Sequence, residues 1–442
     1  MQTYHRLLMF LVLLIGPVLT ASAQDKADRP PNFVIIMADD MGYAGLSCTG
    51  LDRFKTPHFD ALAKEGLRFT DFHSNGTVCS PTRAALLTGR YQQRTGVDGV
   101  VNADPKHPDY QQFLKPEELT FAEMLKTRGY TSGLMGKWHV GYDVKHNPTH
   151  HGFDVFRGFV SGNIDYISHY DRMETFDWWH DRELTQEKGY STHLINKHAI
   201  EFIEANKNKP FCLYVAHEAI HNPNQGPNDP AIRGPKKRPK SELQPTLDAV
   251  REMTLAMDDG LGQIVAKLRE LKLEDNTVVW FFSDNGGTGE NKSTGPKLRG
   301  NKGSVWEGGH RVPAIVWWPG KIKAGTTTDA TVMTMDVMPT LAALSGADLP
   351  ESYEPDGVDV SKLLLKNEPI AARALFWKFK NMLAMREGPW KLVVNQRGLK
   401  GPGLFNLDDD LAEVNNLAEK QPDRVAKMLA AIKAWELDVS AD

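Results

Sequence analysis

Two pairs of oxygen-bearing side chains come directly after strongly apolar segments. Asp39 and Asp40 follow one such segment, and Asp284 and Asn285 follow another. A set of carboxylate and amide oxygens, with no histidine or cysteine in it, suits Ca²⁺ or Mg²⁺ rather than Zn²⁺. Acidic residues at the ends of strands also cap helices or form turns. The pairs alone therefore leave both interpretations open.

Cys79 precedes Ser80 and Pro81 where a helix is predicted to begin. A helix dipole could activate this thiol as a nucleophile, and a buried structural thiol is the alternative. The chain contains two further cysteines, Cys48 and Cys212. Three cysteines are too few for a disulfide scaffold, and at least one has no partner within the chain.

Basic side chains near other predicted strand ends could act on an anionic substrate. Lys137 and His139 are two residues apart, so an extended backbone would point both toward one side. His217 and His221 follow the apolar segment 211–216. A histidine that only forms a hydrogen bond at a strand end is the structural alternative for either of them.

The apolar segments predict an α/β protein with a central, mostly parallel sheet flanked by helices. Nearly unbroken apolar runs are typical of buried parallel strands. Ligand sites in such sheets lie at the carboxyl ends of the strands, so the two oxygen-bearing pairs are expected to share one site. Predicted strands cover 32–38, 130–135, 211–216 and 277–283, and predicted helices cover 57–64, 119–128, 192–205 and 243–271.

The pattern changes near residue 366 to short strand-like segments and a terminal amphipathic helix over 422–437. We therefore expect a catalytic α/β domain over 24–365 and a C-terminal α+β subdomain with an antiparallel sheet over 366–442. Two long insertions, 152–190 and 222–244, interrupt the alternation of strands and helices. Long connections of this kind are often functional.

Residues 1–23 have the features of a signal peptide. His5 and Arg6 precede an apolar run, and Ala21-Ser22-Ala23 provides a small-residue cleavage site. We expect an exported protein, either periplasmic or secreted (lysosomal or extracellular in a eukaryote), without stable membrane insertion after cleavage. The 442 residues contain 52 Lys+Arg and 56 Asp+Glu, a formal net charge of −4. This balance does not indicate a nucleic-acid partner.

Five segments resemble the signatures of the formylglycine-dependent (type I) sulfatase family. They are Asp39-Asp40-Met41-Gly42; Cys79-Ser80-Pro81-Thr82-Arg83 with Leu87-Thr88-Gly89-Arg90; Gly129-Tyr130-Thr131 with Gly136-Lys137-Trp138-His139; Ser283-Asp284-Asn285-Gly286; and residues 298–313, which include Lys302, Glu307 and Arg311. The resemblance implies the alkaline-phosphatase-like fold.

The resemblance implies that a maturation enzyme oxidises Cys79 to formylglycine, an aldehyde that hydrates to a geminal diol. One hydroxyl can attack sulfur, and the other can then expel sulfate and restore the aldehyde, whereas a serine would stall as its sulfate ester. Arg83 is implied to hold the diol. An unmodified Cys79 is the alternative where the maturation enzyme is absent.

The resemblance also implies one Ca²⁺ ion held by Asp39, Asp40, Asp284, Asn285 and the modified Cys79. The ion would act as a Lewis acid and as a template for the sulfate group.

Four further residues take implied roles around the sulfate group. Lys137 and His139 would bind sulfate and adjust the diol, and Lys302 would contact sulfate. His221 would protonate the leaving alcohol, with His217 as its rival. Glu307 and Arg311 are interpreted as structural ion-pair partners.

Weaker signals concern sugars and surface charge. The aromatic residues of the first insertion could stack on sugar rings or form a local core; they are Tyr166, His169, Tyr170, Trp178 and Trp179. The basic run 236–240 could attract a sulfated polymer or be a solvated loop. Asn75 and Asn291 begin glycosylation sequons, and the first lies too near Cys79 to be used.

The expected function is hydrolysis of a carbohydrate sulfate ester, with galactose or N-acetylgalactosamine sulfate in a glycosaminoglycan or algal galactan favoured. The expected partners are a sulfated oligo- or polysaccharide and the formylglycine-generating maturation enzyme. One alternative is a phosphonate monoester or phosphodiester hydrolase of the same superfamily. Another is a non-catalytic protein that binds sulfated glycans.

Overall fold

The computed structural model describes residues 29–235, 246–288 and 297–441. The predicted signal peptide, the basic run 236–240 and the sequon at Asn291 lie outside the described residues. Within the described residues, no helix combines the length and the apolar character needed to cross a membrane.

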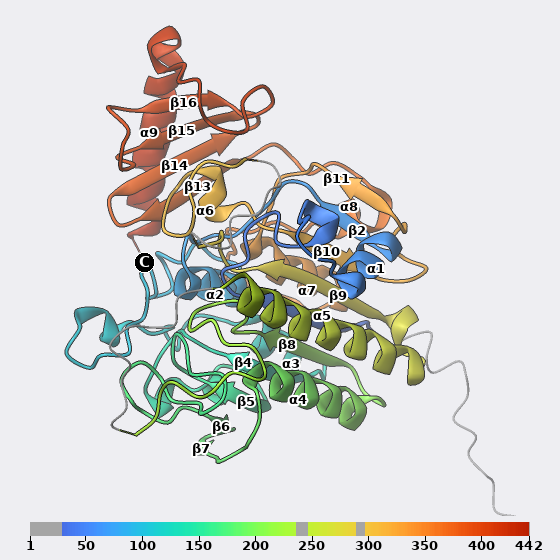
Figure 1. The fold of residues 1–442 in the computed structure, drawn as a ribbon. Helices are drawn as coiled ribbons and strands as arrows, with labels where there is room; N and C mark the ends of the chain where they lie inside the picture. The colour runs from blue at the N-terminus through green and yellow to red at the C-terminus, as the bar shows by residue number, and fades with distance from the viewer. Residues whose placement is uncertain (1–28, 236–245, 289–296, 442) are drawn as a thin grey trace, which may run out of the picture.

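The described residues contain a ten-stranded central sheet (Figure 1). Across the sheet, the strands are β11 (Thr326–Thr328), β2 (Leu67–Phe69), β10 (Ala314–Trp317), β9 (Thr277–Ser283), β1 (Asn32–Ala38), β8 (Phe211–Ala216), β4 (Thr131–Lys137), β5 (Val155–Phe159), β6 (Trp179–His180) and β7 (Glu183–Leu184). The five strands from β9 to β5 run parallel, while β10 and β6 pair antiparallel to their neighbours. The predicted mostly parallel α/β sheet is confirmed.

Helices cover both faces of the sheet. In β1, Phe33, Ile35 and Met37 face one core while Val34 and Ile36 face the other, as the two-residue period of a strand requires. Helices α1, α4 and α5 pack on the second face, and α2, α3, α7 and α8 pack on the first. Their bounds are α1 (Pro57–Glu65), α2 (Cys79–Thr88), α3 (Phe121–Lys126), α4 (Ser191–Asn206), α5 (Leu247–Glu270), α7 (Val337–Ser345) and α8 (Ser361–Lys366).

A second, antiparallel sheet follows near the C-terminus and stands at one end of the molecule with a helix against it (Figure 1). It is formed by β13 (Ala374–Phe379), β14 (Met382–Glu387), β15 (Trp390–Val394) and β16 (Gly403–Asn406), with α9 (Pro422–Val439). These elements form a hydrophobic cluster that also includes Tyr91, Val305, Trp306, Met333 and Met335 from the preceding part of the chain. We propose to place the boundary of this subdomain at residue 366, the last residue of α8.

The insertion 152–190 contains more regular structure than its sequence indicated. Its first part forms β5, which continues the parallel sheet beside β4. The rings of Tyr166, His169 and Trp178 are buried, and His169 stacks on Trp178 with a centroid distance of 4.6 Å. These three rings therefore form a local core and cannot stack on a sugar.

The structure also shows the state of two kinds of modifiable side chain. Cys48 and Cys212 form no disulfide; Cys212 is buried in β8, whereas Cys48 is only partly buried. Asn75 is fully buried, and its side-chain oxygen accepts hydrogen bonds from Thr334 and Met335. Burial makes Asn75 inaccessible to glycosylation.

Candidate active site

The two oxygen-bearing pairs meet at the carboxyl ends of neighbouring strands. In the register of β1 and β9, Ala38 lies opposite Ser283, so the residues that follow become neighbours. The backbone N–H of Asp40 donates to Asp284 Oδ1 at 3.2 Å, and Asn285 Nδ2 donates to Asp40 Oδ1 at 2.8 Å. The structure thus brings the two pairs together in one buried cluster.

Two buried cations contact this cluster. Arg83, on α2, lies 2.9 Å from Asp284 Oδ2 and 3.4 Å from Asp39 Oδ2, and it also donates to the carbonyl of Lys137. The Lys137 ammonium pairs with Asp39. Burial and the nearby Asp39 raise the pKa of Asp284 to about 7, although Arg83 opposes this shift. Burial also opposes ionisation of Asp39, but Lys137 is among the charges that keep its pKa below the ordinary value.

Two oxygen atoms in the cluster lack a hydrogen-bond partner among the described residues. They are Asp39 Oδ1 and Asn285 Oδ1, and both are buried. An unpartnered buried acceptor costs free energy, which a bound cation would offset. Together with Asp40 and Asp284, these atoms form an oxygen-only donor set that fits a hard divalent cation.

Cys79 is the first residue of α2 and opens onto a cavity of about 200 Å³. Burial raises the pKa of the Cys79 thiol, while Lys137 and Lys302 oppose the shift. The cavity is lined by Cys79, Val100, Val101, Asn102, Ala103, His139, Tyr142, Gly162, Arg172, His221 and Lys302. Cys79 is therefore the side chain at which a substrate and the buried cluster can meet.

Lys302 and His221 line the cavity with Cys79 and also contact the acidic cluster. Lys302 Nζ is 2.6 Å from Asp40 Oδ1, and His221 Nε2 is 3.8 Å from Asp40 Oδ2. His221 Nδ1 lies 2.6 Å from the carbonyl oxygen of Asn222. Burial, with Lys302 acting in the same direction, lowers the pKa of His221 to about 4, so its ring is neutral near pH 7 without substrate.

The other two histidines predicted near the site differ in position. His139 lines the cavity; its Nε2 lies 2.9 Å from the carbonyl oxygen of Val101, and its buried Nδ1 has no partner among the described residues. His217 is also buried but does not line the cavity, and burial lowers its pKa to about 3. Between the two rivals, the geometry favours His221 over His217 for contact with substrate.

Three cavity residues carry no family signature and were not singled out from the sequence. Asn102 and Tyr142 lie in connections on either side of β4, and Arg172 lies in the insertion 152–190. For these three residues, the only signal in the sequence was that Arg172 lies in a long insertion.

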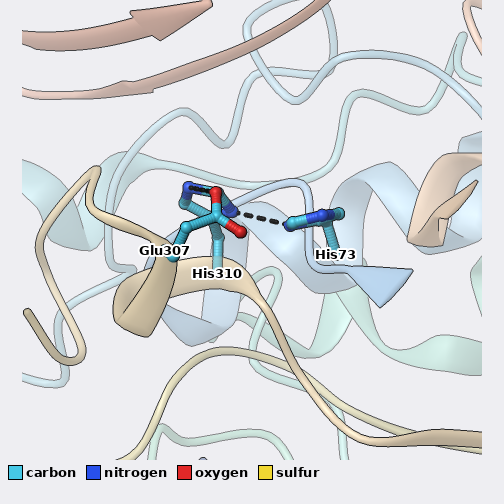
Figure 2. Close-up of side chains that lie close together, drawn as sticks. All are labelled: His73, Glu307 and His310. Carbon is cyan, nitrogen blue, oxygen red and sulfur yellow. Dashed lines mark hydrogen bonds and ion pairs between the residues drawn. The ribbon is translucent and has the colours of Figure 1, made fainter. Parts of the chain in front are cut away.

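A second buried cluster connects β3 (Phe72–His73) and the segment 307–311 to the C-terminal sheet, and Figure 2 shows three of its side chains: His73, Glu307 and His310. The Nδ1 atoms of His73 and His310 are 2.9 Å apart. Lys391, from β15, donates to Glu307 Oε1 at 2.9 Å and to His310 Nε2 at 3.0 Å. Arg311 pairs with Glu307 at 3.1 Å, as the sequence predicted. Hydrogen bonds therefore occupy the atoms that a metal ion would need, and the cluster is an ion-pair network.

The short helix α6 (Glu307–His310) connects this network to the site. Gly286, directly after Asn285, donates its N–H to Gly309 O at 2.9 Å, and Lys302 donates its N–H to Gly287 O at 3.1 Å. A Cβ atom on Gly286 would lie 1.9 Å from Gly308 O, so glycine allows the close approach. Displacement of α6 would move both Lys302 and Asn285.

Comparison with known proteins places this site in a family. Residues 31–347 match the family described as Sulfatase, and residues 301–436 match the family described as N-sulphoglucosamine sulphohydrolase, C-terminal. The chain belongs to the sulfatase family. It is a sulfuric ester hydrolase of the alkaline-phosphatase-like superfamily.

Known sulfatases are similar over most of this chain. Arylsulfatase G of Rattus norvegicus is 30% identical over 95% of this sulfatase and 92% of the relative. N-acetylgalactosamine-6-sulfatase of Mus musculus is 33% identical over 83% of this chain and 72% of the relative. The solved structure of Ps i-CgsB in complex with k-i-k-neocarrahexaose superposes with a TM-score of 0.82 at 28% identity, covering 92% of this chain and 93% of that one.

Proposed function

We propose that this sulfatase is exported and hydrolyses sulfate esters of a carbohydrate, using Cys79 in its formylglycine form and one bound Ca²⁺. One observation carries the proposal. Cys79 shares a cavity with Lys302 and His221, and both of these side chains border the buried oxygen-only cluster.

The carbohydrate substrate is supported by what similar proteins act on or bind. One relative is named for N-acetylgalactosamine 6-sulfate, and one similar structure holds neocarrahexaose. We therefore favour a sulfated galactose or N-acetylgalactosamine unit. The signal-peptide features of residues 1–23 support export.

The residues present fit the two groups that the proposal adds. Asp39, Asp40, Asp284 and Asn285 would hold Ca²⁺, which would supply Lewis-acid stabilisation of sulfate oxygens. The hydrated aldehyde derived from Cys79 would supply a nucleophilic hydroxyl and a second hydroxyl for release of sulfate.

The other side chains orient the sulfate group and manage its charge and protons. Lys302 and His139 line the cavity and would bind the sulfate oxygens. Arg83 pairs with Asp39 and Asp284, and Lys137 pairs with Asp39; these ion pairs would hold the two carboxylates in place. His221 would give a proton to the leaving sugar oxygen; the negative charge of a bound sulfate favours its protonated form and offsets the effect of burial on its pKa.

The direct test is hydrolysis by mature protein in which peptide mass confirms the aldehyde at residue 79. Sulfate release is measured on defined sulfated galactose and N-acetylgalactosamine oligosaccharides, and aryl sulfate is compared with aryl phosphodiester. We expect sulfate release from at least one sugar and preference for the aryl sulfate. Dominant phosphodiester turnover would support the phosphodiesterase alternative, and glycan binding without sulfate release would support the non-catalytic one.

A further inference from the structure

Arg172 is a cavity residue whose charge has no neutralising partner. Its side chain is exposed and contributes to the same cavity as Cys79 and Lys302. In the part of the chain that the structure describes, no carboxylate lies within ion-pair distance of Arg172. Lys302, in contrast, is already paired with Asp40.

The turn that presents Arg172 is held by hydrogen bonds. Asp171 Oδ1 accepts from the N–H groups of Met173 and Thr175, each at 2.8 Å. The N–H of Asp171 also donates to Thr175 O at 2.8 Å. The backbone on both sides of Arg172 is therefore fixed, which lowers the entropy cost of using this side chain for binding.

Two acidic side chains, Asp171 and Asp177, act with Arg172 on the charge of Tyr142, and both accept hydrogen bonds from backbone N–H groups. Asp171 is occupied by its own turn, as described above. Asp177 accepts from the N–H groups of Val160 and Ser161 at 3.0 and 2.8 Å. Among the described residues no ion pair takes up the charge of Arg172, which opposes the rise in the pKa of Tyr142 that burial, Asp177 and Asp171 cause.

The size of the cavity indicates what Arg172 would meet. About 200 Å³ is below the roughly 300 Å³ at which pockets for drug-sized ligands begin, so the space suits the reacting sulfate and little more than one sugar ring. Two cationic side chains line the cavity: Lys302 pairs with Asp40 of the acidic cluster, and Arg172 is exposed. The proposed function assigns Lys302 to the sulfate that is hydrolysed, which leaves Arg172 for a different anionic group.

We infer that Arg172 binds a second anionic group of the substrate, a sulfate ester or a carboxylate on the reacting sugar or its neighbour. This inference rests on the proposed function and narrows its substrate class to doubly anionic saccharides. A guanidinium is suited to the role because it can donate two parallel hydrogen bonds to either anion.

Competitive inhibition of 4-nitrophenyl sulfate hydrolysis tests the inference without knowledge of the natural sugar. The inhibitors are inorganic sulfate, N-acetylgalactosamine 6-sulfate and N-acetylgalactosamine 4,6-disulfate, and N-acetylgalactosamine 6-sulfate linked to a uronic acid tests the carboxylate. We expect at least one doubly anionic saccharide to bind more tightly than the monosulfate. Arg172→Met should weaken that inhibitor about tenfold, the effect of one charge-assisted hydrogen bond, and leave inorganic sulfate within twofold.

Two variants separate charge and geometry from general disruption. Arg172→Lys keeps the charge without the bidentate geometry and should give an intermediate loss. Arg182→Met removes an exposed arginine of the same insertion that does not line the cavity, and it should change no inhibition constant.

Three outcomes would overturn the inference: equal weakening of all inhibitors in Arg172→Met, no weakening of any of them, or wild-type enzyme that binds no doubly anionic saccharide better than the monosulfate. Each leaves the proposed sulfatase activity intact. Absence of 4-nitrophenyl sulfate hydrolysis by the aldehyde-bearing wild type would instead count against the proposed function itself.

Discussion

Buried charges at the strand ends determine what this site can hold. Asp39, Asp40 and Asp284 are buried together and contact Lys137, Arg83 and Lys302. Breaking one partner from such a group is costly because it leaves a charge buried without compensation. These cations already offset the carboxylates, while Asp39 Oδ1 and Asn285 Oδ1 have no hydrogen-bond partner among the residues that the structure describes. A divalent ion would complete the cluster.

Removal of the proposed ion should therefore affect both activity and stability. We expect EGTA to abolish sulfate release and to lower the melting temperature, with calcium restoring both. Calcium at about 100 times its Kd would stabilise the fold by about 2.7 kcal/mol. Differential scanning calorimetry and a sulfate assay provide the measurements, with magnesium as the comparison ion. Activity and melting temperature that ignore chelators would contradict the assignment of Asp39, Asp40, Asp284 and Asn285 as ligands.

The loss of kcat in His221→Ala should increase with the need of the leaving group for a proton. A sugar alcohol is a poor leaving group and nitrophenol is a good one, so His221→Ala should lower kcat much more for sugar sulfates than for 4-nitrophenyl sulfate. General acid catalysis usually contributes a factor of about 10²–10⁴. The loss of kcat should therefore be at least about 10²-fold greater for a sugar sulfate than for 4-nitrophenyl sulfate. His217→Ala serves as the comparison variant. Equal slowing of both substrates by His221→Ala would point to another acid.

At the scale of elements, the sequence was most informative where an element is long and apolar. β1, β8 and β9 have the predicted bounds because each is a continuous buried run. The short strands β2, β10 and β11 were not predicted, since three or four residues provide too little periodicity. β6 and β7, of two residues each, were missed for the same reason.

The ion-pair network that contains Glu307 and His310 could not be predicted, because its members are far apart in the sequence. Arg386 and Asp71, which pair at 2.8 Å, are separated by 315 positions. The sequence indicated an ion pair between Glu307 and Arg311, which are four residues apart on the chain, but nothing in it indicated Lys391. Local spacing can indicate local pairs only.

Replacing Lys391, on β15, tests how strongly the buried ion-pair network stabilises the packing of these elements. Lys391 is fully buried and bridges Glu307 and Glu413 at 2.9 Å each, so Lys391→Met leaves the buried Glu413 without its cation and Glu307 with Arg311 alone. We expect a loss of about 3–5 kcal/mol in the free energy of unfolding. Lys427→Met removes an exposed lysine paired with Glu387 at 3.0 Å, and it should cost at most about 1 kcal/mol. Urea unfolding of both variants gives the comparison; similar small losses would show that the buried network contributes little.

At the scale of the whole molecule, the sequence predicted the fold class and the family. It did not predict several residues that line the cavity at Cys79. The family signatures fall near strand ends, on α2 and on the segment 298–313, where we propose that the sulfate group binds. Asn102, Tyr142 and Arg172 come from connections without a signature and line the same cavity as Cys79. We propose that substrate specificity depends on these residues, which the sequence did not indicate.

The central claim is that Cys79 acts only after conversion to formylglycine. The most direct measurement is sulfate release from a sulfated saccharide by preparations whose converted fraction at residue 79 is determined by peptide mass, with Cys79→Ala as the reference. We predict that activity rises in proportion to the converted fraction and falls to background in Cys79→Ala, while its melting temperature stays near that of the unconverted protein. Equal activity in unconverted and converted protein, or retained turnover in Cys79→Ala, would contradict the account.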